Sequence, residues 1–218
     1  MRRGLTLVEL LVTITVLSVA ALLVIPSMSQ TGVLRIQAAV RTITSDIAFA
    51  QTEAMAFQSR RGIYFGVTPV DEAGTAFASG NGYVVCEPTG SELTTDNVQQ
   101  YMLYLPEDPS KPFARTFDNE MLYGGAEIES AEFDGGSALF FDELGGPLAA
   151  LDSTEPGSGG VIRIVAEDFG LEYELTVEAM TGRVDVNRVD DDAPEEDEGG
   201  DGGGDDSGFD VEDHDAET

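Results

Sequence analysis

The chain begins with Met1-Arg2-Arg3-Gly4, and residues 5–25 continue as LTLVELLVTITVLSVAALLVI. Apart from Glu9 and a few hydroxyl side chains, residues 5–25 are apolar. A helix of this length extends about 31 Å, which is close to the hydrocarbon thickness of a bilayer. The stretch therefore predicts a helix that crosses a membrane once.

Two other interpretations of residues 5–25 fit less well. A secretory signal peptide has a shorter apolar region followed by a small-residue cleavage site, which Pro26-Ser27-Met28 does not provide. A buried core helix would not need such a long apolar run flanked by arginines. Arg2 and Arg3 place the N-terminus of the predicted span in the cytoplasm, because basic residues are retained on that side.

Glu9 is the one ionisable side chain within residues 5–25. A charge near the centre of a spanning helix costs roughly 2.5–3.5 kcal/mol, so it normally has a partner of opposite charge. The stretch contains no basic side chain, but cleavage between Gly4 and Leu5 would create a free amine four residues before Glu9. The amine of a neighbouring copy could then be neutralised by Glu9, which predicts a polymer of subunits.

The stretch Gly4-Leu5-Thr6-Leu7-Val8-Glu9-Leu10 resembles the N-terminal signal of type IV pilins and of the pseudopilins of type II secretion. The resemblance implies that a prepilin peptidase cuts after Gly4 and methylates the new N-terminus at Leu5, and that Glu9 serves subunit assembly. Leu5 departs from the phenylalanine that is usual at that place. Pro26 matches a helix-kinking proline of the family, and a proline kinks a helix or ends its first segment.

Beyond Gly32, apolar residues recur at spacings of three and four, as on one face of an amphipathic helix. The predicted buried stripe consists of Ile36, Val40, Ile43, Ile47, Ala50, Ala54 and Phe57. Packing against a sheet is its simplest role; a heptad coiled coil also fits, but the stripe covers less than four heptads. Phe49 lies on the other face, so we expect it to be exposed in one subunit and to contact neighbouring helices in a filament.

Short runs rich in β-branched and aromatic residues follow Arg60-Arg61, and Gly, Pro, Asn and Asp clusters separate them. The predicted strands are 62–67, 82–86, 101–105, 137–141, 161–166, 171–178 and 183–187. Residues 171–178 alternate between apolar and polar side chains, and Thr181-Gly182 predicts a hairpin turn. A long N-terminal helix followed by antiparallel strands predicts an α+β fold.

Residues 40–66, 139–147 and 181–184 resemble segments of the GspH/FimT-like branch of the pilin relatives. The resemblance implies a pilin fold, in which a long N-terminal helix packs on an antiparallel sheet domain. The predicted organisation is a leader peptide (1–4), a transmembrane and assembly helix (5–28), a globular domain (29–189) and an acidic tail (190–218).

The tail, residues 190–218, holds 15 of the 41 acidic residues and neither Lys nor Arg. It cannot bury enough apolar surface to offset its ordering entropy, so it is predicted to be disordered. Its simplest role is to keep the protein soluble; weak Ca²⁺ capture and adaptation to high salt are alternatives. The remaining chain has 26 acids against 11 bases, a net charge of −15, so nucleic acid is not an expected ligand.

Cys86, the sole cysteine, is predicted to be a small apolar residue of a strand. His214, the sole histidine, lies in the acidic tail. No Ser-His-Asp, Cys-His or zinc-binding arrangement is therefore expected, and we expect neither an enzyme nor a cofactor or metal site.

The resemblance implies a structural minor pseudopilin or pilin of a type II secretion or type IV pilus machine, assembled into a periplasmic filament that supports protein secretion. The expected partners are the prepilin peptidase, other pilins or pseudopilins, the inner-membrane assembly platform and the inner membrane itself. The N-terminus would be cytoplasmic and the globular domain periplasmic. A FimT-like minor pilin that binds DNA for uptake is the alternative, although Arg2-Arg3 and Arg60-Arg61 are the sole adjacent basic pairs.

Overall fold

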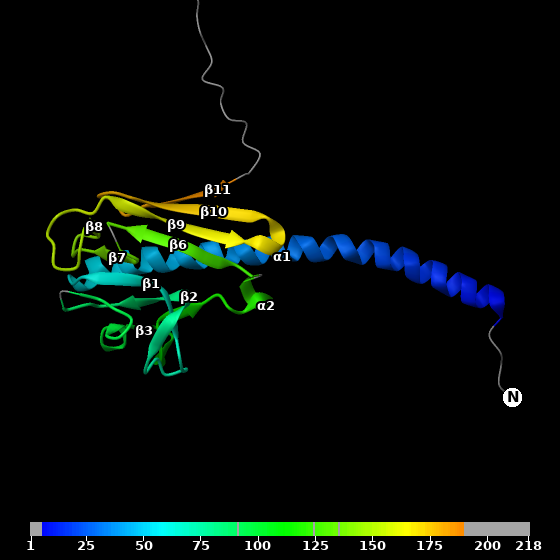
Figure 1. The fold of residues 1–218 in the computed structure, drawn as a ribbon, viewed down its shortest axis with the longest axis horizontal. Helices are drawn as coiled ribbons and strands as arrows, with labels where there is room; N and C mark the ends of the chain where they lie inside the picture. Colours follow the sequence, from blue (N-terminus) through cyan, green and yellow to red (C-terminus); the bar gives the residue numbers. More distant parts are fainter. Residues whose placement is uncertain (1–5, 91, 124, 135, 190–218) are drawn as a thin grey trace, which may run out of the picture.

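The structure is a computed structural model that describes residues 6–90, 92–123, 125–134 and 136–189, with the backbone alone for residues 20–31 and residue 120. The predicted leader, Leu5 and the tail therefore lie outside the described residues. Figure 1 shows one long helix, whose N-terminal part extends well beyond the sheets that follow it in the chain.

This helix, α1 (Leu7–Phe57), is continuous. It therefore does not end at Pro26, and the predicted boundary between residues 28 and 29 falls inside it; a kink at Pro26 stays a prediction. The helix ends where Gln58 adopts a left-handed conformation (φ 51°) and donates its backbone N–H to the carbonyl of Ala54. No helix in the part of the chain that the structure describes is long and apolar enough to cross a membrane.

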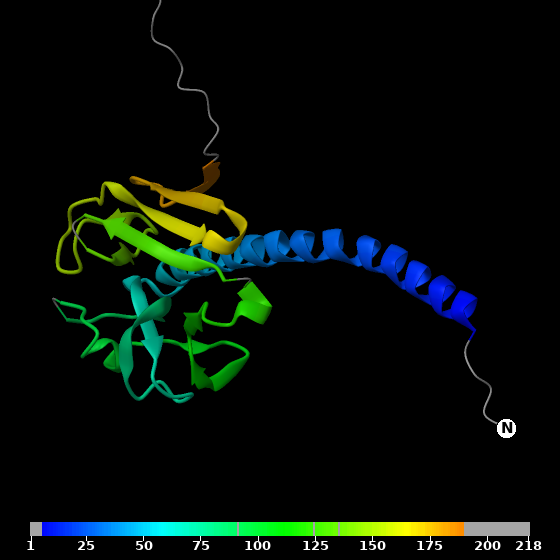
Figure 2. The same cartoon turned by 45° about the vertical axis from the view of Figure 1, so that its right-hand side comes forward.

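Two larger antiparallel sheets follow α1 within the described residues. The first has the order β5-β2-β1-β7-β8, formed by β1 (Arg61–Pro69), β2 (Phe77–Cys86), β5 (Ala114–Thr116), β7 (Ala138–Phe141) and β8 (Pro147–Leu148). The second has the order β11-β10-β9-β6, formed by β6 (Glu127–Phe133), β9 (Gly159–Ala166), β10 (Leu171–Glu178) and β11 (Val184–Val189). Figure 2 shows the second sheet above and the first below the line of α1.

Smaller elements lie between the strands of the two larger sheets. The 3-10 turn η1 (Val98–Gln100) and the paired strands β3 (Tyr104–Leu105) and β4 (Asp108–Pro112) lie between β2 and β5, α2 (Glu120–Tyr123) leads from the first sheet to the second, and the 3-10 turn η2 (Glu167–Phe169) lies between β9 and β10. The strand predicted over 101–105 is reduced to β3, because residues 98–101 form the η1 turn and its end. The edge strand β6 was not predicted, since its acidic residues interrupt the alternation of apolar side chains that would indicate a strand.

The main core joins α1 to both sheets. The predicted stripe is buried from Ile36 to Ala54, and Ala39 extends it. The stripe meets apolar side chains of both sheets: Ile63, Phe65, Leu139 and Phe141 of the first, Ile162, Ile164, Leu175 and Val177 of the second. The rings of Phe65 and Phe133 stack with centroids 5.8 Å apart and link the sheets directly. The alternating burial predicted for residues 171–178 is confirmed in β10.

Phe57 was wrongly assigned to the buried stripe, because its side chain is 64% exposed. It is the last residue of α1, and the left-handed Gln58 turns the chain away from the helix axis immediately after it. The ring of Phe57 instead lies beneath the guanidinium of Arg61, whose Cζ is 5.5 Å from the ring centroid.

Two glycines with positive φ allow a test of how closely the second sheet is packed. Gly159 (φ +82°) would bring an added Cβ within 2.1 Å of the Val177 carbonyl oxygen, whereas Gly66 (φ +76°) has open space around its Cβ position. We expect Gly66→Ala to lower the free energy of unfolding by about 1 kcal/mol through backbone strain alone. Gly159→Ala should lose about 1–3 kcal/mol more, because the β9–β10 pair must separate.

Urea unfolding of the two glycine variants in the same detergent gives this comparison directly. Equal losses for Gly159→Ala and Gly66→Ala would contradict the close approach of β9 and β10 at residue 159.

Candidate functional site

The exposed arm of α1, residues 7–19, is the most unusual surface of the described chain. All nine of its Leu, Ile and Val side chains are more than half exposed: Leu7, Val8, Leu10, Leu11, Val12, Ile14, Val16, Leu17 and Val19. Figures 1 and 2 agree that this part of the helix projects away from both sheets. Soluble monomers rarely leave so large a continuous apolar surface in water. The arm therefore requires lipid or other protein chains around it.

Glu9 lies in the first turn of α1. Thr6 is the N-cap residue, and its Oγ1 accepts the backbone N–H of Glu9 at 3.2 Å. The positive end of the helix dipole favours a carboxylate at this place. The Thr6-Leu7-Val8-Glu9 pattern has the spacing of a capping box, a local signal that the sequence analysis did not use.

Glu9 is exposed, and among the described residues no basic side chain forms an ion pair with it. The helix terminus gives this carboxylate a local stabilisation but no full counter-charge. Gly4 and Leu5, where cleavage and methylation are predicted, lie outside the described residues, so the role of Glu9 in assembly stays a prediction.

Gly32 lies where α1 leaves the globular domain. A Cβ at this position would lie 2.2 Å from ring atoms of Phe169, the last residue of η2. The ring thus packs against the bare backbone of the helix, which a larger side chain at position 32 would prevent. From here toward its C-terminus one side of α1 is covered by the sheets.

Asp46 ties the buried face of α1 to the first sheet. Its Oδ2 accepts the hydroxyl of Tyr83 at 2.7 Å and the Nε of Arg115 at 2.9 Å. Burial, followed by the neighbouring Asp46 carboxylate, raises the pKa of the Tyr83 hydroxyl well above its usual value. A buried carboxylate that is paired and hydrogen-bonded in this way restrains both the rotation and the axial position of the helix.

Gln51 provides a second polar restraint nearer the C-terminal end of α1. Its Nε2 donates to the carbonyl oxygen of Gly145 at 2.6 Å and to that of Thr181 at 2.7 Å. Gly145 lies in the turn after β7, and Thr181 lies in the turn between β10 and β11. One helix side chain therefore joins turns from both sheets.

Phe49 is not exposed as predicted. Its side chain is half-buried against the main core, and its ring centroid lies 5.0 Å from that of Phe113. Phe113, which follows β4, covers part of the side of α1 that was expected to be free. The basis for assigning Phe49 to contacts between subunits is thereby lost.

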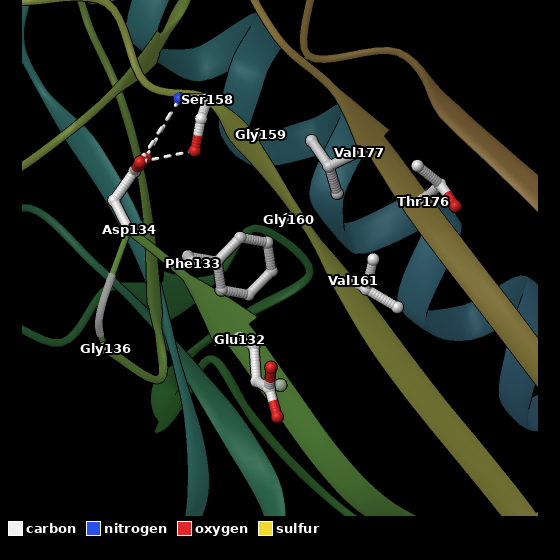
Figure 3. Close-up of a pocket in the computed structure, with 11 residues that line it drawn as sticks. Glu132, Phe133, Asp134, Gly136, Ser158, Gly159, Gly160, Val161, Thr176 and Val177 are labelled. Carbon is white, nitrogen blue, oxygen red and sulfur yellow. Dashed lines mark hydrogen bonds between the residues drawn. The ribbon is translucent and has the colours of Figure 1, made fainter.

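A cavity of about 620 Å³ opens on the second sheet (Figure 3). Its lining comes from β6, β9, β10 and the glycine-rich turn that precedes β9, and it includes Glu132, Phe133, Asp134, Ser158 and Thr176. The Asp134 carboxylate accepts the backbone N–H and the hydroxyl of Ser158, so it joins the end of β6 to the turn that precedes β9. The lining contains no histidine, cysteine or basic side chain.

No cluster of three metal-ligating side chains occurs within the described part of the chain. Cys86 is buried in β2, as predicted for a small apolar strand residue, and its thiol contacts the carbonyl of Gly62 at 3.4 Å. Burial raises the pKa of the Cys86 thiol to about 12. A thiol held protonated in this way is a poor nucleophile.

Comparison with known proteins gives one finding, at the N-terminus. The family model for the prokaryotic N-terminal methylation motif matches residues 1–25. No curated protein and no solved structure matches the chain. The match covers Gly4, Leu5 and Glu9 and supports a type IV pilin-like protein. The motif implies processing by prepilin peptidase, anchoring in the inner membrane and assembly with other pilins.

The buried thiol predicts a specific loss of stability at alkaline pH. The unfolded chain releases the Cys86 proton near pH 9.0, whereas the folded chain keeps it until about pH 12. Stability is therefore full below pH 9 and falls above it, by at most about 1.4 kcal/mol per pH unit from this group. Cys86→Ala should remove that contribution and flatten the curve.

Unfolding free energies at pH 8.5, 9.5 and 10.5 test the role of the thiol. Any cavity left by Cys86→Ala is a constant offset, so the slope is the quantity compared with the parent chain. Parallel slopes for the two proteins would show that the thiol is not held protonated by the fold.

Proposed function

We propose that this chain is a minor pseudopilin or minor pilin that assembles into a periplasmic filament through the arm of α1. One observation carries the proposal: an apolar arm with a single carboxylate near its start continues without a break into a helix packed on two sheets. Such a subunit can be held by neighbouring helices or lipid at one end and present a rigid domain at the other.

The proposal includes the pilin fold and its GspH/FimT-like branch. Three features support them: the strand β1 follows directly after the long helix, the turn at Asp142–Gly146 joins β7 to β8, and the β10–β11 hairpin closes the domain. These are the segments that resemble the branch in sequence. Residues 5–28 would anchor the subunit, with the N-terminus in the cytoplasm and the domain in the periplasm.

Within this proposal we favour type II secretion over DNA uptake. The chain without its tail already has a net charge of −15, and the tail adds 15 acids. Nucleic-acid binding depends on neutralising phosphates with basic side chains, which this surface offers in small number. The partners would be a prepilin peptidase, sibling pseudopilins and an inner-membrane assembly platform.

Processing at Gly4 is the first testable consequence. The mature chain, purified from cells with an active prepilin peptidase, should start at Leu5 and carry one methyl group on its amine. Intact-mass and N-terminal peptide spectrometry measure both features. Gly4→Leu should leave the leader attached, and a parent chain that retains Met1–Gly4 would contradict the proposal.

The Glu9 carboxylate gives the second consequence. Glu9→Gln removes the charge with little change of shape, so filament incorporation, measured by co-purification with sheared filaments, should fall at least about tenfold, as expected for the loss of one ion pair in a low-dielectric setting. Glu53→Gln is the matched control, because Glu53 lies on the same helix but on the globular domain. Normal incorporation of Glu9→Gln would overturn the proposed assembly mechanism.

A further inference from the structure

Arg35 and Arg41 stand apart from the other basic residues that the structure describes. Six of those residues lie within 4.0 Å of a carboxylate: Arg60, Arg61, Lys111, Arg115, Arg163 and Arg183. Arg35 and Arg41 form neither an ion pair nor a hydrogen bond with any other described side chain. On a protein with so large an excess of acidic residues, two bases without an ion pair form a candidate site for an anionic partner.

The two arginines flank one exposed part of α1. At 100° per residue, Arg35 and Arg41 lie about 60° to either side of Ala38, and about 9 Å apart along the axis. Ala38 and Arg41 are exposed, and Arg35 is half-buried. We call this surface the Arg35/Arg41 face; it begins one helical turn after Gly32, where α1 enters the globular domain.

The last described strand ends at the same end of the domain. Val189 of β11 pairs with Glu172 of β10. Glu172 is three residues from Phe169, whose ring packs against Gly32. With strands about 4.8 Å apart, Val189 lies within about 15 Å of the backbone of Phe169, whose ring reaches the helix exit. Figure 1 shows the orange end of β11 on the side of the sheets from which the arm of α1 emerges.

The segment that follows Val189 is acidic, so its charge is opposite to that of the Arg35/Arg41 face. Residues 190–198 alone contain seven acids and can extend over about 30 Å, which is enough to reach both arginines. The acidic body of the protein repels this segment elsewhere. Attachment to the same chain also gives it a high local concentration that a free partner does not have.

A lipid headgroup fits the Arg35/Arg41 face less well. If residues 5–25 span the hydrocarbon, the backbone of Arg35 lies about 15 Å beyond the edge of the hydrocarbon layer. The backbone of Arg41 lies about 24 Å beyond that edge. The headgroup layer is only about 5–8 Å thick on each side. Arg41 in particular would lie outside it.

We propose that residues 190–218 dock on the Arg35/Arg41 face of α1 within the same chain. The acidic segment then neutralises the unpaired arginines and covers the helix just outside the membrane. Because the contact is a set of exposed ion pairs, it weakens as salt rises and the Debye length shortens. Whether the acidic segment covers the Arg35/Arg41 face therefore depends on ionic strength.

Zero-length carbodiimide crosslinking of the full-length chain in neutral detergent tests the proposal, because it joins a carboxylate to an amine only when the two are in contact. Lys111 is the only native lysine, so the Arg35→Lys/Arg41→Lys double variant adds amines only at the proposed face. We expect crosslinks from positions 35 and 41 to residues 190–218 at 50 mM salt, and at least a fivefold decrease at 500 mM.

Three controls make the crosslinking result decisive. Arg163→Lys should crosslink to Glu174, its ion-pair partner at 3.5 Å, and shows that the reaction works. Lys111, which pairs with Asp108, should not crosslink to the tail above the level of chance collisions. A mixture of isotope-labelled and unlabelled chains separates contacts within a chain from contacts between chains.

Several outcomes would overturn the proposal. They are crosslinks to carboxylates of other described residues, crosslinks found only between differently labelled chains, or equal crosslinking of the tail to Lys111. Crosslinks that vanish when anionic lipid is added at constant ionic strength would assign the Arg35/Arg41 face to headgroups instead.

Discussion

The apolar stripe of α1 from Ile36 to Ala54, buried against two sheets, holds the whole structure together. Each sheet presents an apolar face to α1, and these two faces need a covering surface to leave water. The helix supplies that surface for both, so neither sheet is stable in this arrangement without it. The same helix continues as the exposed arm, so its intrahelical hydrogen bonds connect the orientation of the arm to that of the domain.

A stripe with spacings of four and three nearly repeats after seven residues, so apolar contacts alone leave the axial position of the helix poorly determined. Asp46 and Gln51 remove that ambiguity. Asp46 must meet Tyr83 and Arg115, and Gln51 must reach the Gly145 and Thr181 carbonyls. A shift by one heptad would separate these groups from their partners and leave the buried Asp46 carboxylate unpaired, which is strongly destabilising.

Charged residues, like apolar ones, are unevenly distributed over the molecule. At least six of the nine basic residues that the structure describes form ion pairs, and four of these pairs join neighbouring strands, turns, or the helix to the first sheet. The remaining acid excess makes copies of the domain repel one another electrostatically. Under the proposed function, association of the subunits would therefore be driven by the apolar arm.

The sequence by itself determined the features that depend on local pattern: the apolar arm with its lone Glu9, the amphipathic stripe, the alternating strand β10 and its hairpin, and the buried Cys86. Hydrophobic periodicity is set by which face of an element meets the core, so these features are readable from one chain. Only the tertiary structure decided the exposure of Phe49 and Phe57, the existence of the acidic edge strand β6, and the burial of Asp46. The states of Phe49 and Asp46 depend on segments distant in sequence, Phe113 beside Phe49 and Arg115 beside Asp46, and no local pattern records that proximity. The exposure of Phe57 instead follows from the left-handed Gln58, which ends the helix immediately after it.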